Sequence, residues 1–117
     1  MPGAGSGSAG LTIVEHTGND ALTEDQAGML HTNRGATGMI TLTLPASATE
    51  GIVFRFAVQE VQSLAIDPGT ATIRDDCGQT ADKYKWANAI GECIEFVADS
   101  NGDWITISKR GTWLEEA

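Results

Sequence analysis

Two histidines, His16 and His31, are the residues best suited to acid–base or metal chemistry, because a neutral imidazole can accept a proton or bind a metal ion near neutral pH. Each lies within a predicted strand, His16 in residues 11–17 and His31 in residues 28–33. We favour a simpler role for both, at the surface or at the edge of a core. The sequence contains no spaced motif of a serine hydrolase, a zinc protease or a phosphate-binding loop, and we predict no enzyme.

Acidic side chains gather in the segment DDCGQTAD, which contributes Asp75, Asp76 and Asp82. Together with Glu92 and Glu95 they offer the carboxylate oxygens that calcium prefers. A solvated acidic loop is the interpretation that we favour, and we predict neither a metal ion nor a cofactor. Paired carboxylates of a glycoside hydrolase would need a fixed separation in a cleft, and an acidic sequence offers too many candidate pairs to identify one.

Three tryptophans in the last third of the chain, Trp86, Trp104 and Trp113, lie near the ends of predicted strands. Exposed indoles would suit a platform that stacks on sugars or a contact between subunits, whereas buried indoles would fill a core. Packing in a core or between subunits is the commoner use. We keep these residues as candidates for a subunit interface or a glycan contact.

The chain has two cysteines, Cys77 and Cys93, and neither has a second cysteine or a histidine at the spacing of a zinc site. Thiols of a protein that is not secreted are usually reduced and partly buried. The spacing of these two does not show whether they form a disulfide.

The charge balance excludes two classes of partner. The 117 residues include 16 acidic and 7 basic ones, which gives a net charge of −9. Nucleic acids and anionic membranes are bound by clustered Lys and Arg, so we predict no nucleic-acid and no membrane partner. The chain also lacks the run of about 18 apolar residues that a membrane-spanning helix needs.

The first ten residues, MPGAGSGSAG, contain only Met, Pro, Gly, Ala and Ser. This composition predicts a flexible arm, which is either a disordered tail or an element that orders against a neighbouring subunit or a larger surface. The arm lacks the basic and apolar regions of a signal peptide, so we expect the protein to stay in the cytoplasm in which it is made. Residues 11–117 are expected to form one domain.

Short segments of alternating apolar and polar residues run from Leu11 to the C-terminus, separated by turns rich in Gly, Asn and Asp. No segment keeps a helical period over three turns, and no internal repeat indicates a solenoid or a propeller. The pattern predicts an all-β fold, namely an antiparallel β-sandwich or a jelly-roll-like barrel. The predicted strands are residues 11–17, 21–23, 28–33, 39–44, 52–61, 63–67, 70–74, 83–86, 91–98 and 103–109, and residues 110–114 end the fold.

The faces of the clearest strands follow from their alternation. In residues 39–44 the side chains of Ile40 and Leu42 share one face, and in residues 52–61 those of Phe54 and Phe56 do. In the last long strand we expect Trp104, Thr106 and Ser108 to lie on one face.

Two predicted hairpins have marked turn sequences. Asp-Pro-Gly at residues 67–69 suits a tight turn between the strands on either side of it. Ser-Asn-Gly-Asp at residues 100–103 carries Asn-Gly at its tip, the strongest short-range signal for a hairpin. The segment DSNGD has a superficial likeness to a calcium loop, but it lacks the glycine and glutamate spacing that such a loop needs.

The stretch GATGMITLTLPASATEG, residues 35–51, resembles part of a β-domain that recurs in virion proteins of tailed bacteriophages. In that domain a strand ending in Leu-Pro is followed by a link of small residues and a glycine. The resemblance covers about residues 20–114 and extends over HTN at 31–33, FRF at 54–56, LAIDP at 64–68, IGE at 90–92 and GTW at 111–113.

Domains of this kind occur in fibres, spikes and capsid decoration proteins, and the resemblance carries no catalytic residues. Fibre and spike proteins are usually long, whereas this chain is one β-domain with a ten-residue arm. The resemblance therefore implies a decoration, or cement, protein that binds the major capsid protein on the outer surface of the virion as a homotrimer. A receptor-binding domain of a tail fibre or spike is the alternative. The residues expected to contact the capsid are Pro2, Gly3 and Gly5 of the arm and Leu11 and Ile13 of the first strand.

Overall fold

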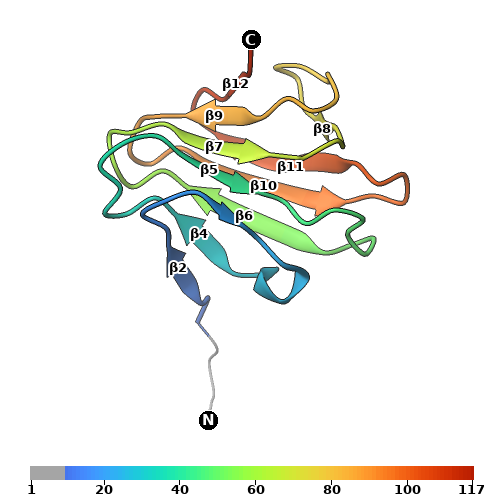
Figure 1. The fold of residues 1–117 in the computed structure, drawn as a ribbon, viewed down its shortest axis with the longest axis horizontal. Coiled ribbons are helices and arrows are strands. Elements are labelled where there is room, and N and C mark those ends of the chain that lie inside the picture. Colours follow the sequence, from blue (N-terminus) through green and yellow to red (C-terminus); the bar gives the residue numbers. More distant parts are fainter. Residues whose placement is uncertain (1–9) are drawn as a thin grey trace.

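The computed structural model describes residues 10–117, which form two β-sheets stacked face to face and one short 3₁₀ helix, η1 (Glu24–Gln26) (Figure 1). The six-stranded sheet has the order β2 (Ile13–Glu15), β4 (Leu30–Thr32), β6 (Val53–Ala57), β10 (Cys93–Ala98), β11 (Trp104–Arg110) and β8 (Ile73–Arg74). The five-stranded sheet has the order β12 (Leu114–Glu115), β9 (Lys85–Ala87), β7 (Leu64–Asp67), β5 (Ile40–Thr43) and β3 (Asp20–Ala21). The predicted all-β class is confirmed.

Both sheets mix parallel and antiparallel strands, so the predicted purely antiparallel pairing is wrong. From β2 to β10 each successive strand lies in the other sheet, and the chain winds around the space between them. Up to β7, a strand that returns to a sheet after one passage through the other runs in the direction of the strand that it joins, so the pairs β2–β4, β4–β6, β3–β5 and β5–β7 are parallel. β9 also returns after one passage, but it pairs antiparallel with β7. This crossing between the sheets needs no internal sequence repeat. Each strand requires only alternating apolar and polar residues, and each crossing requires only a turn.

The inward side chains of both sheets form one hydrophobic core. The predicted faces of β5 and β6 are confirmed, since Ile40, Leu42, Phe54 and Phe56 are all buried. Phe54 and Phe56 lie at the centre, with ring centroids 6.3 Å apart. Other buried members come from β7 to β11 and from residues that directly adjoin strands: Leu22, Leu44, Val58, Leu64, Ile66, Ile73, Ala87, Ile94, Phe96, Ala98, Trp104 and Trp113.

One predicted hairpin forms and the other does not. β10 and β11 pair antiparallel across the Asn-Gly turn, as predicted, with the amide of Asp99 bonded to the carbonyl of Asp103 at 3.0 Å. The turn at residues 67–69 instead passes the chain to the other sheet, where β8 pairs in parallel with β11. The carboxylate of Asp103 accepts a hydrogen bond from the Thr72 amide at 3.0 Å, and this bond ties the incoming strand to β11.

A β-bulge changes which side chains of β11 face inward. The register with β10 shifts between Glu95 and Phe96, so Thr106 pairs with Phe96 and Lys109 pairs with Ile94. A bulge places an extra residue in one strand, which reverses the alternation beyond it. Lys109 therefore lies on the inner face with Thr106, and the prediction that Ser108 shares that face is wrong.

The core predicts a sharp contrast between two neighbouring residues of β5. Leu42→Ala should lower the free energy of unfolding by about 2–5 kcal/mol, because it removes a fully buried side chain and leaves a cavity. Thr41→Ala, on the opposite and half-buried face, should change it by less than about 0.5 kcal/mol. Urea unfolding of both variants measures the difference, and equal losses would contradict the assigned faces.

Candidate functional site

Exposed apolar side chains lie on the edge strand β2 and just before it, near the start of the described residues. Leu11 and Ile13 are 54% and 58% exposed, and β2 is the outermost strand of its sheet (Figure 1). Exposed apolar side chains beside an unpaired strand edge form a favourable binding surface. A groove of about 260 Å³ adjoins this edge and is lined by Ile13, Glu15, Leu30, Thr32, Arg34, Ala57 and Gln59.

The outer edge of β2 also offers backbone hydrogen-bonding groups. Toward β4, the carbonyl of Thr12 accepts from the Leu30 amide at 2.9 Å, and the His16 amide donates to the carbonyl of Thr32 at 2.9 Å. In a parallel pair alternate residues bond to a given neighbour. Ile13 consequently turns its N–H and C=O toward the free edge, where an added strand could pair with them.

The residues predicted to contact a capsid fall into two groups. Pro2, Gly3 and Gly5 lie outside the described residues. Leu11 and Ile13 lie on the exposed edge, at the point where the described part of the chain begins. The geometry of Leu11 and Ile13 is thus compatible with a contact surface.

The three candidate tryptophans have different environments. Trp104 is fully buried, and its ring packs edge-on against Phe54 with centroids 5.7 Å apart. Trp113 is also buried, and its Nε1 donates to the carbonyls of Cys93 and Arg110 at 3.1 and 3.2 Å. Both indoles serve the core of this chain and present no surface to a sugar or a subunit.

Trp86 is the tryptophan that remains partly exposed. It lies on β9 and pairs with Leu114 of the edge strand β12 and with Ala65 of β7. Leu114 is 44% exposed, whereas Ala65 is fully buried. We call Trp86 and Leu114 the Trp86 patch, which is a small apolar surface on the five-stranded sheet.

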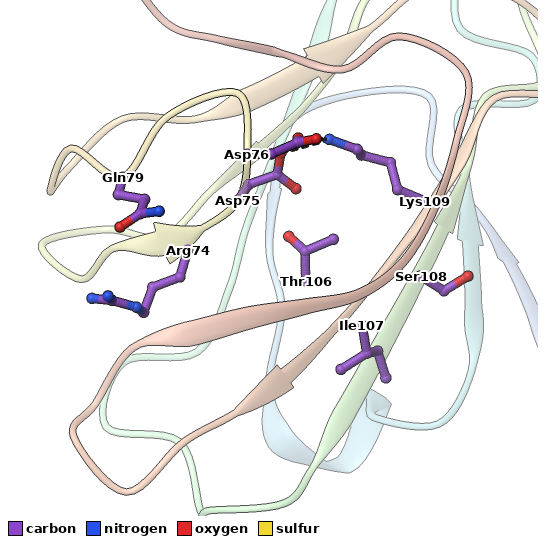
Figure 2. Close-up of a pocket in the computed structure, with 8 residues that line it drawn as sticks. All are labelled: Arg74, Asp75, Asp76, Gln79, Thr106, Ile107, Ser108 and Lys109. Carbon is purple, nitrogen blue, oxygen red and sulfur yellow. Dashed lines mark hydrogen bonds and ion pairs between the residues drawn. The ribbon is translucent and has the colours of Figure 1, made fainter.

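A larger open pocket, of about 490 Å³, lies where β8 meets β11 on the side of the six-stranded sheet opposite β2 (Figure 2). Its lining residues are Arg74, Asp75, Asp76, Gln79, Thr106, Ile107, Ser108 and Lys109. Lys109 Nζ donates to Asp75 Oδ1 at 2.7 Å and also to Asp76 (Figure 2). The inward direction of Lys109, set by the β-bulge, makes this triad possible, and the acidic sequence alone does not indicate it.

Asp75 is the buried member of the triad. Its side chain is 1% exposed, whereas that of Asp76 is 85% exposed. Burial alone would raise the pKa of Asp75, but the hydrogen bonds from Lys109 and from the Cys77 amide outweigh it, so this pKa lies far below its usual value. The two carboxylates in turn hold the pKa of Lys109 above its usual value, against the opposing effect of burial. The triad thus pairs the buried Asp75 carboxylate with the Lys109 ammonium at this edge of the core, and the second carboxylate, Asp76, lies at the surface.

The acidic residues predicted as a possible ion site do not gather in one place. Asp75 and Asp76 bind Lys109, while Glu95 on the outer face of β10 pairs with Arg55. Glu92 accepts hydrogen bonds from the amides of Ala89 and Thr112 at 2.9 and 2.7 Å. Within residues 10–117 no group of three or more His, Cys, Asp or Glu residues is arranged to hold a metal ion.

The cysteines are free and half-buried. Burial, followed by the neighbouring carboxylate of Asp75, raises the pKa of Cys77 to about 11. A thiol with so high a pKa is almost wholly protonated near neutral pH and is a poor nucleophile.

A fully buried cation, Lys85, lies close to the same end of the sheets. Its Nζ donates to the carbonyl of Gly78 at 3.0 Å and to Glu115 at 2.5 Å. The hydrogen bonds from Lys85 and from the Thr80 amide lower the pKa of Glu115. Gly78 makes room for this contact, because a Cβ at this position would displace the Glu115 carboxylate. Alternation within β9 points the Lys85 side chain into the core, although lysine side chains are usually exposed to solvent.

The two histidines form a pair that their sequence positions do not reveal. His16 Nε2 lies 2.9 Å from His31 Nδ1, and both side chains are buried. The predicted location at the edge of a core is correct for both, but their contact depends on the parallel pairing of β2 with β4.

Comparison with models of known protein families finds none that matches this chain, and a search of curated proteins finds no significant relative. The resemblance to phage virion domains therefore stays a prediction. Among the described residues, no helix is long and apolar enough to cross a membrane.

The triad predicts how stability depends on pH. The pKa of Asp75 is lower in the folded state than its unfolded value of about 3.9, so the unfolded state binds this proton first as pH falls. The stabilisation is present above about pH 4 and is lost below it. Asp75→Asn should therefore lose less stability than the wild type between about pH 7 and pH 3 in urea unfolding.

Asp76→Asn is the matched control, because Asp76 shares Lys109 but is largely exposed. This variant should follow the wild-type pH dependence closely. A wild-type slope that is retained in Asp75→Asn would contradict the assignment.

Proposed function

We propose that this protein is a decoration, or cement, protein of a bacteriophage head, which binds the assembled capsid as a homotrimer and stabilises it. The supporting observation is the exposed apolar edge of β2, with Leu11 and Ile13 directly after the small-residue arm. The sequence resemblance to phage virion β-domains points to the same setting. In this proposal the protein is made in the host cytoplasm and ends on the outer surface of the virion.

The capsid contact would use the free edge of β2 and the groove beside it. An extended segment of the major capsid protein could pair with the backbone groups of Ile13, while its side chains enter the groove. Stabilisation would follow from mass action, because a ligand that binds only the assembled state adds about 4 kcal/mol per site at a thousandfold excess over its Kd.

The trimer contact would use the Trp86 patch, since Trp104 and Trp113 are committed to the core. A partly exposed tryptophan beside an exposed leucine is typical of the apolar centre of a subunit interface. We take the two stacked sheets for a β-sandwich, which is an architecture that leaves edges and outer faces available for such contacts.

Binding to expanded, DNA-free heads tests the proposal. The protein should cosediment with expanded heads, and Ile13→Glu should weaken this binding at least about tenfold, because it places a charge on the apolar edge. Val61→Glu is the matched control, because Val61 is 75% exposed and lies outside the groove. The native mass should correspond to three chains.

Two results would contradict the proposal. Heads that carry the protein and resist heat no better than bare heads would remove the stabilising role. A loss of binding in Val61→Glu as large as that in Ile13→Glu would remove the assignment of the β2 edge to the capsid.

The partly exposed indole of Trp86 favours one second candidate, a receptor-binding domain of a tail fibre or spike. Trp86 would then stack on a host glycan. This role predicts binding on a glycan array that Trp86→Ala reduces at least about tenfold, together with binding to cells rather than to heads. A blank array and unchanged adsorption by Trp86→Ala would contradict it.

A further inference from the structure

The histidine pair lies between the edge strand and the rest of the six-stranded sheet. His16 directly follows β2, and His31 is the middle residue of β4. The His16 side chain is 6% exposed and His31 is fully buried. Their ring centroids are 5.1 Å apart. The 2.9 Å contact between His16 Nε2 and His31 Nδ1 is a side-chain hydrogen bond between the two strands.

The surroundings fix where the protons lie. His31 Nε2 is 3.0 Å from the carbonyl of Gln26, which can only accept, so His31 carries its proton on Nε2. His31 Nδ1 must then accept, and His16 Nε2 must carry the proton that it donates. His16 Nδ1 is left as the free basic nitrogen, 3.6 Å from Asp20 Oδ2.

This arrangement accepts one proton but not two. A first proton on His16 Nδ1 faces the Asp20 carboxylate and leaves the pair intact. A second proton must bind His31 Nδ1, which would set two N–H donors and two positive charges against each other in a buried site. The pair has to separate to accommodate the second proton.

The other elements around the pair supply no further charge. β6 contributes the rings of Phe54 and Phe56, whose centroids lie 5.7 and 5.6 Å from that of His31. Arg55, between them, pairs with Glu95 instead.

The 3₁₀ helix faces His31 with the Gln26 carbonyl. Its two carboxylates are engaged elsewhere, because Glu24 accepts from the Thr49 amide at 3.0 Å and Asp25 accepts from the Thr23 hydroxyl. Asp20 is thus the one charged group that acts on both rings.

The protonation equilibria follow from this burial. Burial, followed by repulsion from His31, lowers the pKa of His16, and Asp20 opposes the shift in part. Burial also lowers the pKa of His31, against the effects of the Gln26 carbonyl and Asp20. A base whose pKa is lower when folded stabilises the fold above its unfolded pKa of about 6.5, and this contribution is lost as pH falls below that value.

We propose that His16 and His31 form an acid-sensitive latch, which holds the edge strand β2 on the sheet near neutral pH and releases it when both rings are protonated. The latch is independent of what β2 binds. Where β2 contacts a capsid, as in the function proposed above, attachment would become weaker in acid.

Amide hydrogen exchange of the whole chain, followed by NMR, tests the latch. Between about pH 7.5 and pH 5, protection factors of the His16 and Leu30 amides, which bond β2 to β4, should fall at least about tenfold. Those of Phe96, in the centre of the sheet, should stay nearly constant. At the higher pH, the nitrogen chemical shifts of the two imidazole rings should show that each histidine carries its proton on Nε2.

Two variants distinguish the latch from general acid unfolding. His16→Gln should abolish the selective loss, because its amide can donate to neutral His31 and, after a flip, accept from charged His31. Asp20→Asn should move the loss to lower pH, since the carboxylate that favours the first proton is gone. The proposal is overturned if protection factors in the wild type change uniformly across the sheet. It is also overturned if His16→Gln loses β2 protection as the wild type does, or if His31 is protonated on Nδ1.

Discussion

The inner face of each sheet is covered by side chains of the other. The six-stranded sheet contributes the rings of Phe54, Phe56 and Trp104, and the five-stranded sheet contributes Leu42, Leu64 and Ile66. Every other feature depends on that contact. From β2 to β10 each successive strand lies in the opposite sheet, so consecutive strands bury their inner faces in the space between the two sheets. The parallel pairing of β2 with β4, and with it the contact of His16 with His31, is a consequence of this crossing.

Buried polar groups of the six-stranded sheet lie at its two edges, where the hydrophobic core ends. At the β2 edge the inner face is completed by the histidine pair, and at the opposite edge by the Asp75–Lys109 triad. The two closures differ in chemistry. The triad stays charged over the whole neutral range, while the histidine pair is stable only with one proton or none added. The two edges of one sheet therefore respond differently to the same change of pH.

The sequence predicts those parts of the structure that depend on near neighbours. Alternation identifies the inward faces of β5 and β6, and Asn-Gly identifies the turn between β10 and β11. Strand direction is not a local property, because it depends on which sheet the next strand joins, and the prediction of antiparallel sheets fails for that reason. The bulge in β11 reverses the faces of Ser108 and Lys109, and no residue type in the strand marks it.

The same limit applies to the candidate sites. Leu11 and Ile13 are identified by sequence because an edge strand after an arm is a local pattern. The histidine pair and the Asp75–Lys109 triad join residues 15 and 34 positions apart, and only the folded topology brings them together. The sequence does not distinguish Trp104 and Trp113 from Trp86. Only the structure shows that the first two are buried in the core.

The winding of the chain also determines how the protein can fold. Strands that neighbour each other in a sheet are mostly two or more strands apart along the chain, and long loops must close before such pairs form. Folds with this property form slowly, in milliseconds to seconds. The β10–β11 hairpin is the exception, since its strands are consecutive. Because its two strands are joined by a short turn, this pair closes the shortest loop between neighbouring strands and has the lowest loop-closure cost.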